Sequence, residues 1–439
     1  MPSCLVSPHR TFQLIYGAAH GAKSLIWHAS EFLFAFFLTE AIGLPPSHVG
    51  LMLGLSLVLN ALMDLSVGWM LRRRVSNSLH ASRLQWLGAW ISALMLLAFA
   101  STGLLPTGLR TGFALASLLA FRLAYPFYDN PQNTLLAFAT HDDGGRARLA
   151  ATRYIAGGAA RLVLVTGFAP MMIGQSALIQ SSRFGALCLG MALTAVVTAG
   201  GLRAFIRRWP DIEVRGRQDE KTHLSARAGQ TAPLGALLAI AFTLSVSASL
   251  FGRLEPYFAT FAIRHVVNAS IMMSAATAGS LLSQGFWAHV AQRLALTDVL
   301  RTALAVLSVG AALFYLLAPL GLAWSAGACV LYGVGSGGVS MSLWSLLAGR
   351  ATALTGMFTG TAAFGLYTCF SKLGLALAAM AMGLILAGVD YRNQILAMGP
   401  IFAAMAGAPI AGALVIGLLS ISFRAGALSF SQPRRAWSS

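Results

Sequence analysis

Apolar runs about as long as a bilayer is thick follow one another along most of the chain. A membrane-spanning helix needs about 20 apolar residues in succession. Twelve stretches fit, with approximate cores at 12–39, 46–71, 84–104, 112–138, 150–173, 184–206, 233–261, 269–290, 299–318, 322–347, 357–388 and 396–423. The sequence therefore predicts an all-α membrane protein with twelve transmembrane helices.

One long polar interruption, RRWPDIEVRGRQDEKTHLSARAGQ at 207–230, divides these stretches six and six. Gly68–Trp69 near the end of the second stretch are matched by Gly285–Phe286 in the eighth, an offset of about half the chain, as expected for two related halves. The predicted parts are a six-helix bundle at 1–206, a cytoplasmic loop at 207–231, a second six-helix bundle at 232–423 and a cytoplasmic tail at 424–439.

Composition supports membrane insertion, and charge sets its direction. Of the 439 residues, 57% are hydrophobic and 10% are charged, against about 25% charged in soluble domains. The net charge of +17 comes mainly from arginines, which gather in loops at alternate helix ends. The richer side carries Arg72, Arg73, Arg74, Arg83, Arg146, Arg148, Arg203, Arg207, Arg208, Arg215, Arg217, Arg227, Arg293, Arg301, Arg350, Arg424, Arg434 and Arg435, and the other side Arg110, Arg183, Arg264 and Arg392. This bias predicts both termini in the cytoplasm and no nucleic-acid partner.

Two further features limit the function. The start, MPSCLVSPHRT, has no small-residue cleavage site, so we expect the first apolar segment to be retained as a helix. Cys4, Cys188, Cys329 and Cys369 are scattered without paired spacing, which predicts packing residues rather than disulfides or a zinc site. No metal and no cofactor is predicted.

Polar side chains form a stripe inside the first stretch. They recur at intervals of three and four residues, which places them on one helix face; the stripe comprises Tyr16, His20, Lys23, Ser24, Trp27, His28 and Glu31. Lys23 lies about 16 Å into the helix, too deep for its amine to reach the headgroups easily. The stripe predicts a polar solute site, although hydrogen bonding between helices is the alternative, and packing is favoured for the two histidines taken singly.

The second and eleventh stretches each carry an ionisable group at membrane depth. In LNALMDLSVGW at 59–69, Asn60 and Asp64 lie one turn apart, and Lys372 follows Thr368 by one turn in GLYTCFSKLG. A buried charge is costly and marks a functional site by default. Pairing of Asp64 with the nearby arginines at 72–74 is the structural alternative.

The fourth and fifth stretches add a polar motif and a basic face. Asp129 and Asn133 lie in DNPQNTLL, whose proline frees a backbone carbonyl, and Arg153, Gly157 and Arg161 share one face. The alternatives are a structural pair between Asp129 and Arg122, and an interfacial anchor at Arg153.

Elsewhere in the apolar stretches, structural roles are favoured. Arg253 and Glu255 are interpreted as an interfacial pair near a helix end. The run YGVGSGGVS at 332–340 lacks the lysine of a phosphate loop, and close helix packing explains it better.

Several of these motifs resemble the glycoside–pentoside–hexuronide:cation symporters, the melibiose permease-like family of the major facilitator superfamily. The similar features are Tyr16-Gly17 with Lys23, TEAIGL at 39–44, Gly68–Trp69 after Asp64, DNPQNTLL at 129–136, RxRLxxxR at 146–153, and Lys372 before Gly374. The resemblance implies a major facilitator fold in the bacterial inner membrane, with Asp64, Lys372 and Thr368 at the cation site and Asp129 and Arg153 at the sugar.

Two residues depart from that family's pattern. Asn60 replaces the second carboxylate of the cation site, and Ser24 replaces an acid that binds sugar hydroxyls. One acid beside a lysine suits a proton better than Na⁺, because hard cations need several oxygen ligands.

We therefore predict a monomeric secondary transporter of a small polar, sugar-like or glycoside-like solute, coupled to H⁺, with Na⁺ as the alternative ion. The predicted coupling residues are Asp64, Asn60, Lys372 and Thr368, and the predicted solute-binding residues are Tyr16, Lys23, Ser24, Trp27, Asp129, Asn133 and Arg153. A lysolipid or other amphiphile transporter and a non-transporting assembly factor of the same fold are the alternatives. A membrane enzyme is not favoured, since no catalytic pair has convincing spacing.

Overall fold

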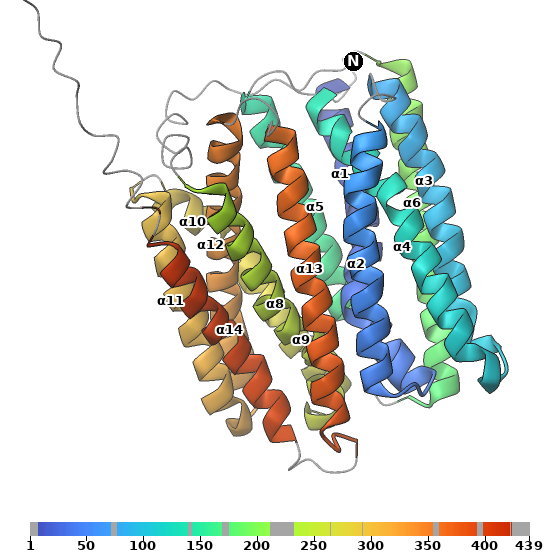
Figure 1. Cartoon of the computed structure of the whole chain (residues 1–439), viewed down its shortest axis with the longest axis vertical. Helices are drawn as coiled ribbons and strands as arrows, with labels where there is room; N and C mark the ends of the chain where they lie inside the picture. The colour runs from blue at the N-terminus through green and yellow to red at the C-terminus, as the bar shows by residue number, and fades with distance from the viewer. Residues whose placement is uncertain are drawn as a thin grey trace, which may run out of the picture.

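The described part of the chain is helical throughout. The structure is a computed structural model, and it describes residues 8–71, 77–138, 143–168, 175–210, 232–263, 265–291, 293–353, 360–392, 398–421 and 423. All regular elements within these ranges are helices, most of them running side by side along the long axis (Figure 1). The all-α prediction is therefore confirmed for the described residues.

Each predicted apolar stretch overlaps one long helix. The helices of the first half are α1 (Pro8–Phe36), continued by the π-helix η1 (Phe37–Ala41), α2 (Pro46–Leu71), α3 (Ser78–Ala100), α4 (Thr107–Phe138), α5 (Asp143–Val163), continued by the π-helix η3 (Leu164–Phe168), and α6 (Ala177–Arg208). Those of the second half are α8 (Leu234–Phe258), continued by η6 (Ala259–Ile263), α9 (Val266–Leu282), α10 (Gln284–Val290), α11 (Leu296–Leu317), α12 (Leu322–Ala353), α13 (Gly360–Ala387) and α14 (Gly399–Leu419).

Within the described ranges, nine spans are long and apolar enough to cross a membrane. The long helices outside this set are α1, α4 and α5, and these carry most of the charged groups at membrane depth. Lys23 and Glu31 lie on α1, Arg122 and Asp129 on α4, and Arg153 on α5. The charged residues of these three helices therefore lower the hydropathy that favours their insertion into a membrane.

The helices form two groups that meet along a central seam (Figure 1). Apart from α2, which packs most extensively against α13, helices α1 to α6 pack mainly against one another, and α8 to α14 do the same. The seam is made by α2 against α13, α1 against α8, and α5 against α9. Gly50 and Gly383 allow the closest approach of α2 and α13, because a Cβ on Gly50 would lie only 2.8 Å from Cα of Gly383.

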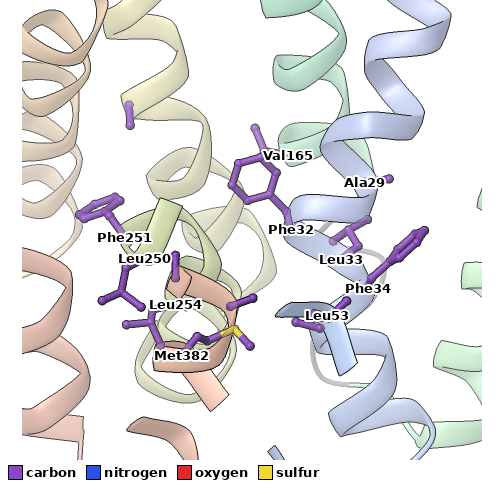
Figure 2. Packing of buried hydrophobic residues seen from close by; sticks show 14 of the residues in the cluster. Ala29, Phe32, Leu33, Phe34, Leu53, Val165, Leu250, Phe251, Leu254 and Met382 are labelled. Carbon is purple, nitrogen blue, oxygen red and sulfur yellow. The ribbon is translucent and has the colours of Figure 1, made fainter. Parts of the chain in front are cut away.

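Apolar packing continues across the seam near the end where α1 meets α2, here called the η1 end. Figure 2 shows side chains from both groups in one buried cluster, including Phe32 and Leu33 of α1, Leu53 of α2, Leu250, Phe251 and Leu254 of α8, and Met382 of α13. The two groups are therefore held together by ordinary core packing at this end.

The glycine run of α12 serves close helix packing, as predicted. A Cβ on Gly333 would lie 1.9 Å from the carbonyl oxygen of Ala276 on α9, and one on Gly335 would lie 2.2 Å from the backbone nitrogen of Leu307 on α11. A larger residue at either position would force the helices apart.

Two smaller predictions have mixed outcomes. The eighth predicted stretch is broken at Ser283, so Gly285–Phe286 lie in the first turn of the short helix α10 rather than at the end of the long helix α9. Cys188, Cys329 and Cys369 are free and buried, which confirms their role as packing residues, while Cys4 lies outside the described residues.

Candidate solute and coupling site

A cavity of about 410 Å³ lies between the two helix groups. Most of its lining residues have polar side chains, and they come from both groups. The first group contributes His20, Lys23, Ser24, Trp27, His28, Tyr125, Asp129, Arg153, Tyr154, Gly157, Gly158 and Arg161, and the second contributes Thr277, Ser280, Leu281, Ser336, Ser340 and Lys372. This volume falls within the range of about 300–1,000 Å³ that is usual for sites of drug-sized ligands.

Lys23 and Asp129 form the first ion pair of this cavity. Lys23 Nζ lies 2.5 Å from Asp129 Oδ1 and donates a hydrogen bond of 3.2 Å to Asn133 Oδ1. The same amide oxygen accepts a 2.8 Å hydrogen bond from an Nη of Arg153. Asn133 therefore connects Lys23 of α1 to Arg153 of α5, so three of the predicted solute-binding helices converge on one point.

Asp64 and Lys372 form the second ion pair, and it joins the two helix groups. The Lys372 amine donates to Asp64 Oδ2 across the contact between α2 and α13. Asp64 Oδ1 is buried and has no hydrogen-bond partner among the described residues, and Lys372 Nζ also lies 4.9 Å from the ring centre of Trp27. The alternative of Asp64 pairing with Arg72–Arg74 concerns residues outside the described ranges.

The remaining predicted solute-binding residues take different places. Ser24 and Trp27 line the cavity. Tyr16 does not line it: its side chain is fully buried, its hydroxyl donates to the backbone carbonyl of Gln132 at 3.3 Å, and its ring stacks against His20. Tyr16 therefore supports the packing of α1 on α4 rather than meeting a solute directly.

Two of the predicted coupling residues donate side-chain hydrogen bonds to backbone carbonyl groups. Asn60 is fully buried and donates a 2.8 Å hydrogen bond to the carbonyl of Arg122 on α4. The Thr368 hydroxyl donates within its own helix, to the carbonyl of Gly365 at 2.9 Å. Neither has a hydrogen bond to Asp64 or Lys372 among the contacts of the described residues.

A second charged cluster, formed by Glu31, Arg122 and Arg253, lies beside the seam. Glu31 of α1 pairs with Arg253 of α8 and lies 3.6 Å from a guanidinium nitrogen of Arg122 on α4. All three are at least 93% buried as side chains. This arrangement corrects two interpretations: Arg122 pairs with Glu31 rather than with Asp129, and Arg253 pairs with Glu31 rather than with Glu255.

Helix geometry explains both corrections. Residues two apart on a helix point to different sides, so Arg253 and Glu255 do not meet. Arg122 and Asp129 do share a face of α4, but Asp129 pairs with Lys23 of α1. Arg122 instead lies beside Glu31, which belongs to the same polar stripe of α1.

Polar contacts close the seam at the η1 end. Glu40 accepts hydrogen bonds from the Tyr391 hydroxyl at 2.8 Å and from Arg392 Nε at 3.1 Å, and the hydroxyls of Thr39 and Tyr257 are 2.9 Å apart. Burial raises the pKa of Tyr391, and the hydrogen bond to Glu40 raises the pKa of Arg392. Both therefore stay protonated donors through the physiological range.

Sequence reasoning did not assign several lining residues to the site. His20 and His28 were interpreted singly as packing residues, yet both line the cavity. Arg161 was placed on the face of Arg153 but given no role. Ser280 on α9 and Ser336 and Ser340 on α12 carried no signal, because serines are common at helix contacts in membranes.

Residues 15–425 match the family described as MFS/sugar transport protein. The chain belongs to this family. It is accordingly a multi-pass membrane transporter of the major facilitator superfamily, and its relatives are transporters rather than enzymes.

One curated relative is more specific in its description. This chain is 26% identical over 185 residues to the putative glycoside/cation symporter YagG of Escherichia coli (strain K12). The match covers 42% of this chain and 40% of that relative's length. The family match, rather than this relative, confirms the major facilitator transporter family predicted from the sequence motifs, and the cation-symporter description enters the proposals below.

Several transporters of different solutes have solved structures with the same fold. The xylose transporter XylE from E. coli, in a partially occluded inward open conformation, has a TM-score of 0.65 at 10% identity and covers 99% of this chain and 100% of its own. The nucleoside transporter NupG has a TM-score of 0.62 at 14% identity, with 96% and 100% covered. A bacterial homologue of ferroportin, in its inward-facing state, has a TM-score of 0.61 at 15% identity, with 95% and 100% covered. At these identities the likeness shows the fold alone.

Proposed function

We propose that this MFS transporter is a proton-coupled symporter that moves a small, polar, hydroxyl-bearing solute by alternating access. The observation that carries the proposal is the ion pair between Asp64 and Lys372. It lies beside the cavity and joins the two helix groups, so a change in the protonation of Asp64 changes a contact that has to break when the groups separate.

The site is better suited to H⁺ than to Na⁺. Asp64 is the acid that pairs with Lys372 in the described site, Asp129 is held by Lys23, and Asn60 turns its amide to the α4 backbone. A Na⁺ site needs several oxygen ligands and compensating negative charge. A proton needs only one carboxylate oxygen of Asp64, and its binding removes the negative charge that holds Lys372 in the ion pair. The glycoside/cation symporter description of YagG agrees with cation coupling and leaves the ion open.

The arginine bias supports an orientation in which the η1 end is outside the cell. Arg203, Arg207, Arg208 and Arg301 lie at the opposite end of their helices, as the positive-inside rule requires for the cytoplasmic side. We infer that all twelve long helices span the inner membrane, in halves at 1–206 and 232–423, with both termini in the cytoplasm. The contacts of Glu40 with Tyr391 and Arg392 then close the outside entrance.

The proposed cycle follows from these contacts. With the outside entrance open, Asp64 takes a proton and the solute enters between Lys23, Asp129 and Arg153. Loss of the charge on Asp64 weakens the attraction to Lys372 and allows the groups to move. After release of the solute to the cytoplasm, Asp64 loses its proton and pairs with Lys372 again.

Asp64→Asn is expected to abolish accumulation driven by a pH gradient. A gradient of about one pH unit supplies about 1.4 kcal/mol, which supports about tenfold accumulation for one proton per solute. The variant should only equilibrate the solute. Uptake into proteoliposomes measures this, using the solute that most raises the melting temperature among a panel of sugars, glycosides, organic acids and lysolipids.

A surface carboxylate provides the matched control. Asp298→Asn removes an acid that pairs with Arg301 at the bundle surface and should accumulate solute as the wild type does. Tenfold accumulation by Asp64→Asn would contradict the proposal. Accumulation that follows a Na⁺ gradient would favour the sodium alternative, stabilisation by lysolipids alone would favour an amphiphile transporter, and no uptake of any stabilising solute would favour an assembly factor.

Gly383→Leu is expected to hold the outside entrance open. Its side chain would meet α2 at Gly50, where even a Cβ lies 2.7 Å from Cα of Gly50. We expect a cysteine placed at Ser24 to react with an impermeant thiol reagent from outside about tenfold faster in this background. Gly417→Leu on α14 is the control, because nothing lies within 4 Å of its Cβ. Equal labelling rates in both backgrounds would count against closure at this contact.

A further inference from the structure

Three arginines lie along the contact between α3 and α6, at the end of the molecule opposite η1. Arg83 lies near the start of α3, and Arg203 and Arg207 lie near the end of α6. The two helices pack against each other at the flank of the first helix group (Figure 1). The surface between them, called the α3–α6 groove below, therefore carries three positive charges at one level.

Contacts of Trp86 fix how the two helices meet in this groove. The guanidinium carbon of Arg203 lies 4.5 Å from the centre of the Trp86 ring, and a Cβ on Gly200 would lie 3.2 Å from the indole nitrogen. Arg83 precedes Trp86 by three residues on α3, and Arg207 follows Arg203 by four residues on α6. Residues at these spacings share a helix face, so all three guanidiniums belong to the groove.

The groove arginines lack carboxylate partners within the protein. Neither α3 nor α6 contains an aspartate or a glutamate. The ion pairs formed by the described residues include none with Arg83, Arg203 or Arg207. Arg203 is half-buried, and the other two are exposed. An anion from outside the protein would therefore supply the compensating charge.

The second half of the chain uses the corresponding arginine differently. Its third and sixth long helices are α11 and α14, as α3 and α6 are in the first half. Arg301 of α11 donates to the Ser420 hydroxyl at 3.1 Å and to the Ser420 carbonyl at 3.0 Å, at the end of α14, and it also pairs with Asp298. Protein groups satisfy this arginine, whereas the α3–α6 groove leaves its arginines open to an external partner.

The α3–α6 groove continues into an apolar surface. The rings of Trp86 and Trp90 meet edge to face with their centres 6.4 Å apart. Deeper along the two helices the exposed side chains are apolar, with Trp90 53%, Leu94 61%, Val197 70% and Leu193 58% exposed. Tryptophan is enriched at the headgroup level of membranes. The order of charge, aromatic ring and apolar surface matches the phosphate, glycerol and acyl chains of a phospholipid.

We propose that the α3–α6 groove binds the headgroup of an anionic phospholipid. Arg83, Arg203 and Arg207 donate to its phosphate oxygens, because the planar guanidinium matches phosphate geometry. Trp86 holds Arg203 in position, and the acyl chains lie on the apolar surface. In the proposed orientation this lipid comes from the cytoplasmic leaflet, whose anionic lipids attract basic segments.

The bound lipid would contact the first helix group alone. The seam is made by α1, α2 and α5 against α8, α9 and α13, and neither α3 nor α6 is among these helices. The lipid would therefore stabilise the first group without touching the solute cavity or the pair between Asp64 and Lys372. This inference goes beyond the proposed symport and does not depend on the solute or on the coupling ion.

Lipid binding to the purified full chain in detergent tests the proposal, with native mass spectrometry as the readout. Dioleoyl phosphatidylglycerol is the probe, and dioleoyl phosphatidylcholine has the same chains without net charge. We expect at least about tenfold tighter binding of phosphatidylglycerol, because each basic residue near an anionic headgroup contributes about fivefold in affinity. Arg203→Gln and Arg207→Gln should each lose about fivefold, and the triple variant with Arg83→Gln about 100-fold.

Arg208→Gln is the matched control for surface charge. Arg208 directly follows Arg207 and is also exposed, but neighbouring residues on a helix point to different sides. This variant removes the same charge and should leave the affinity for phosphatidylglycerol within about twofold of the wild type. Equal losses in Arg207→Gln and Arg208→Gln would overturn the groove as a specific site, and so would equal affinities for the two lipids.

Melting temperatures separate lipid binding from folding. Surface substitutions change stability by about 0.5-fold to twofold in the unfolding equilibrium, so each variant without lipid should melt within about 2 °C of the wild type. Phosphatidylglycerol should raise the melting temperature of the wild type and of Arg208→Gln, and should leave that of the triple variant unchanged. Equal stabilisation of the triple variant would overturn the proposal.

Two further measurements test the chemistry of the groove. Trp86→Leu removes the ring beside Arg203 and should weaken binding of phosphatidylglycerol by about twofold to fivefold, while Trp86→Phe should keep part of the effect. Inorganic phosphate should not displace the lipid, because it lacks acyl chains. Displacement of phosphatidylglycerol by millimolar inorganic phosphate would identify a free phosphate site and overturn the assignment to a lipid.

Discussion

Lys23→Ala is expected to lower the initial rate of solute uptake by about 100-fold to 1,000-fold. Lys23 compensates Asp129 and donates to Asn133, which in turn accepts from Arg153. Removing one partner of a buried ion pair typically costs about 3–5 kcal/mol, because the other charge remains without compensation. In this variant the unpaired charge would be the carboxylate of Asp129, which lies inside the solute site itself. Initial rates in proteoliposomes at equal protein content measure the effect.

A charge-neutral double variant separates transport from folding. Lys23→Ala combined with Asp129→Ala leaves no abandoned charge, so its melting temperature should return towards that of the wild type. Its uptake should remain at the level of Lys23→Ala, because the polar groups that hold the solute are gone. Recovery of uptake together with stability would show that the pair is structural only.

Glu31→Gln is expected to have the largest effect on stability. It would leave Arg122 and Arg253, which are 0% and 1% exposed, without their shared carboxylate. A loss of about 3–5 kcal/mol corresponds to a fall in melting temperature of about 5–10 °C. Thermal unfolding of the purified protein, followed by tryptophan fluorescence, measures this.

Glu40→Gln is the matched control on the same polypeptide segment. Glu40 also binds an arginine, but Arg392 is 44% exposed, and pairs in contact with solvent contribute about 1 kcal/mol or less. Its melting temperature should therefore change by only about 1–2 °C. A similar fall in both variants would mean that burial does not decide the contribution of Glu31.

The sequence predicts the ionisable site better than it predicts the pairs. Asp64, Lys372, Lys23 and Asp129 stand out because a charge in an apolar stretch is rare and costly. Which partner each one takes depends on how the helices rotate against one another, and local spacing does not contain that information. The interpretation of Asp129 with Arg122 failed for this reason, since it considered one helix alone.

Uncharged members of the site were harder to predict. Ser336 and Ser340 become lining residues only because α12 faces the cavity, and Tyr16 and Thr368 turn to backbone partners despite lying on helices of the site. The helices themselves were predictable from the length of the apolar stretches. Their ends differ from the predicted bounds where polar residues extend a helix, as at Asp143, where α5 begins before the apolar run.

The buried charges of α1 also bear on how the protein is made. As an isolated segment entering the bilayer, α1 would have to carry Lys23, at a cost of about 3 kcal/mol, with Glu31 in addition. Their partners are synthesised later: Asp129 and Arg122 arrive with α4, and Arg253 only with α8, after the central loop. We therefore expect stable insertion of α1 to depend on downstream helices, and biogenesis of the first half to be completed by the second.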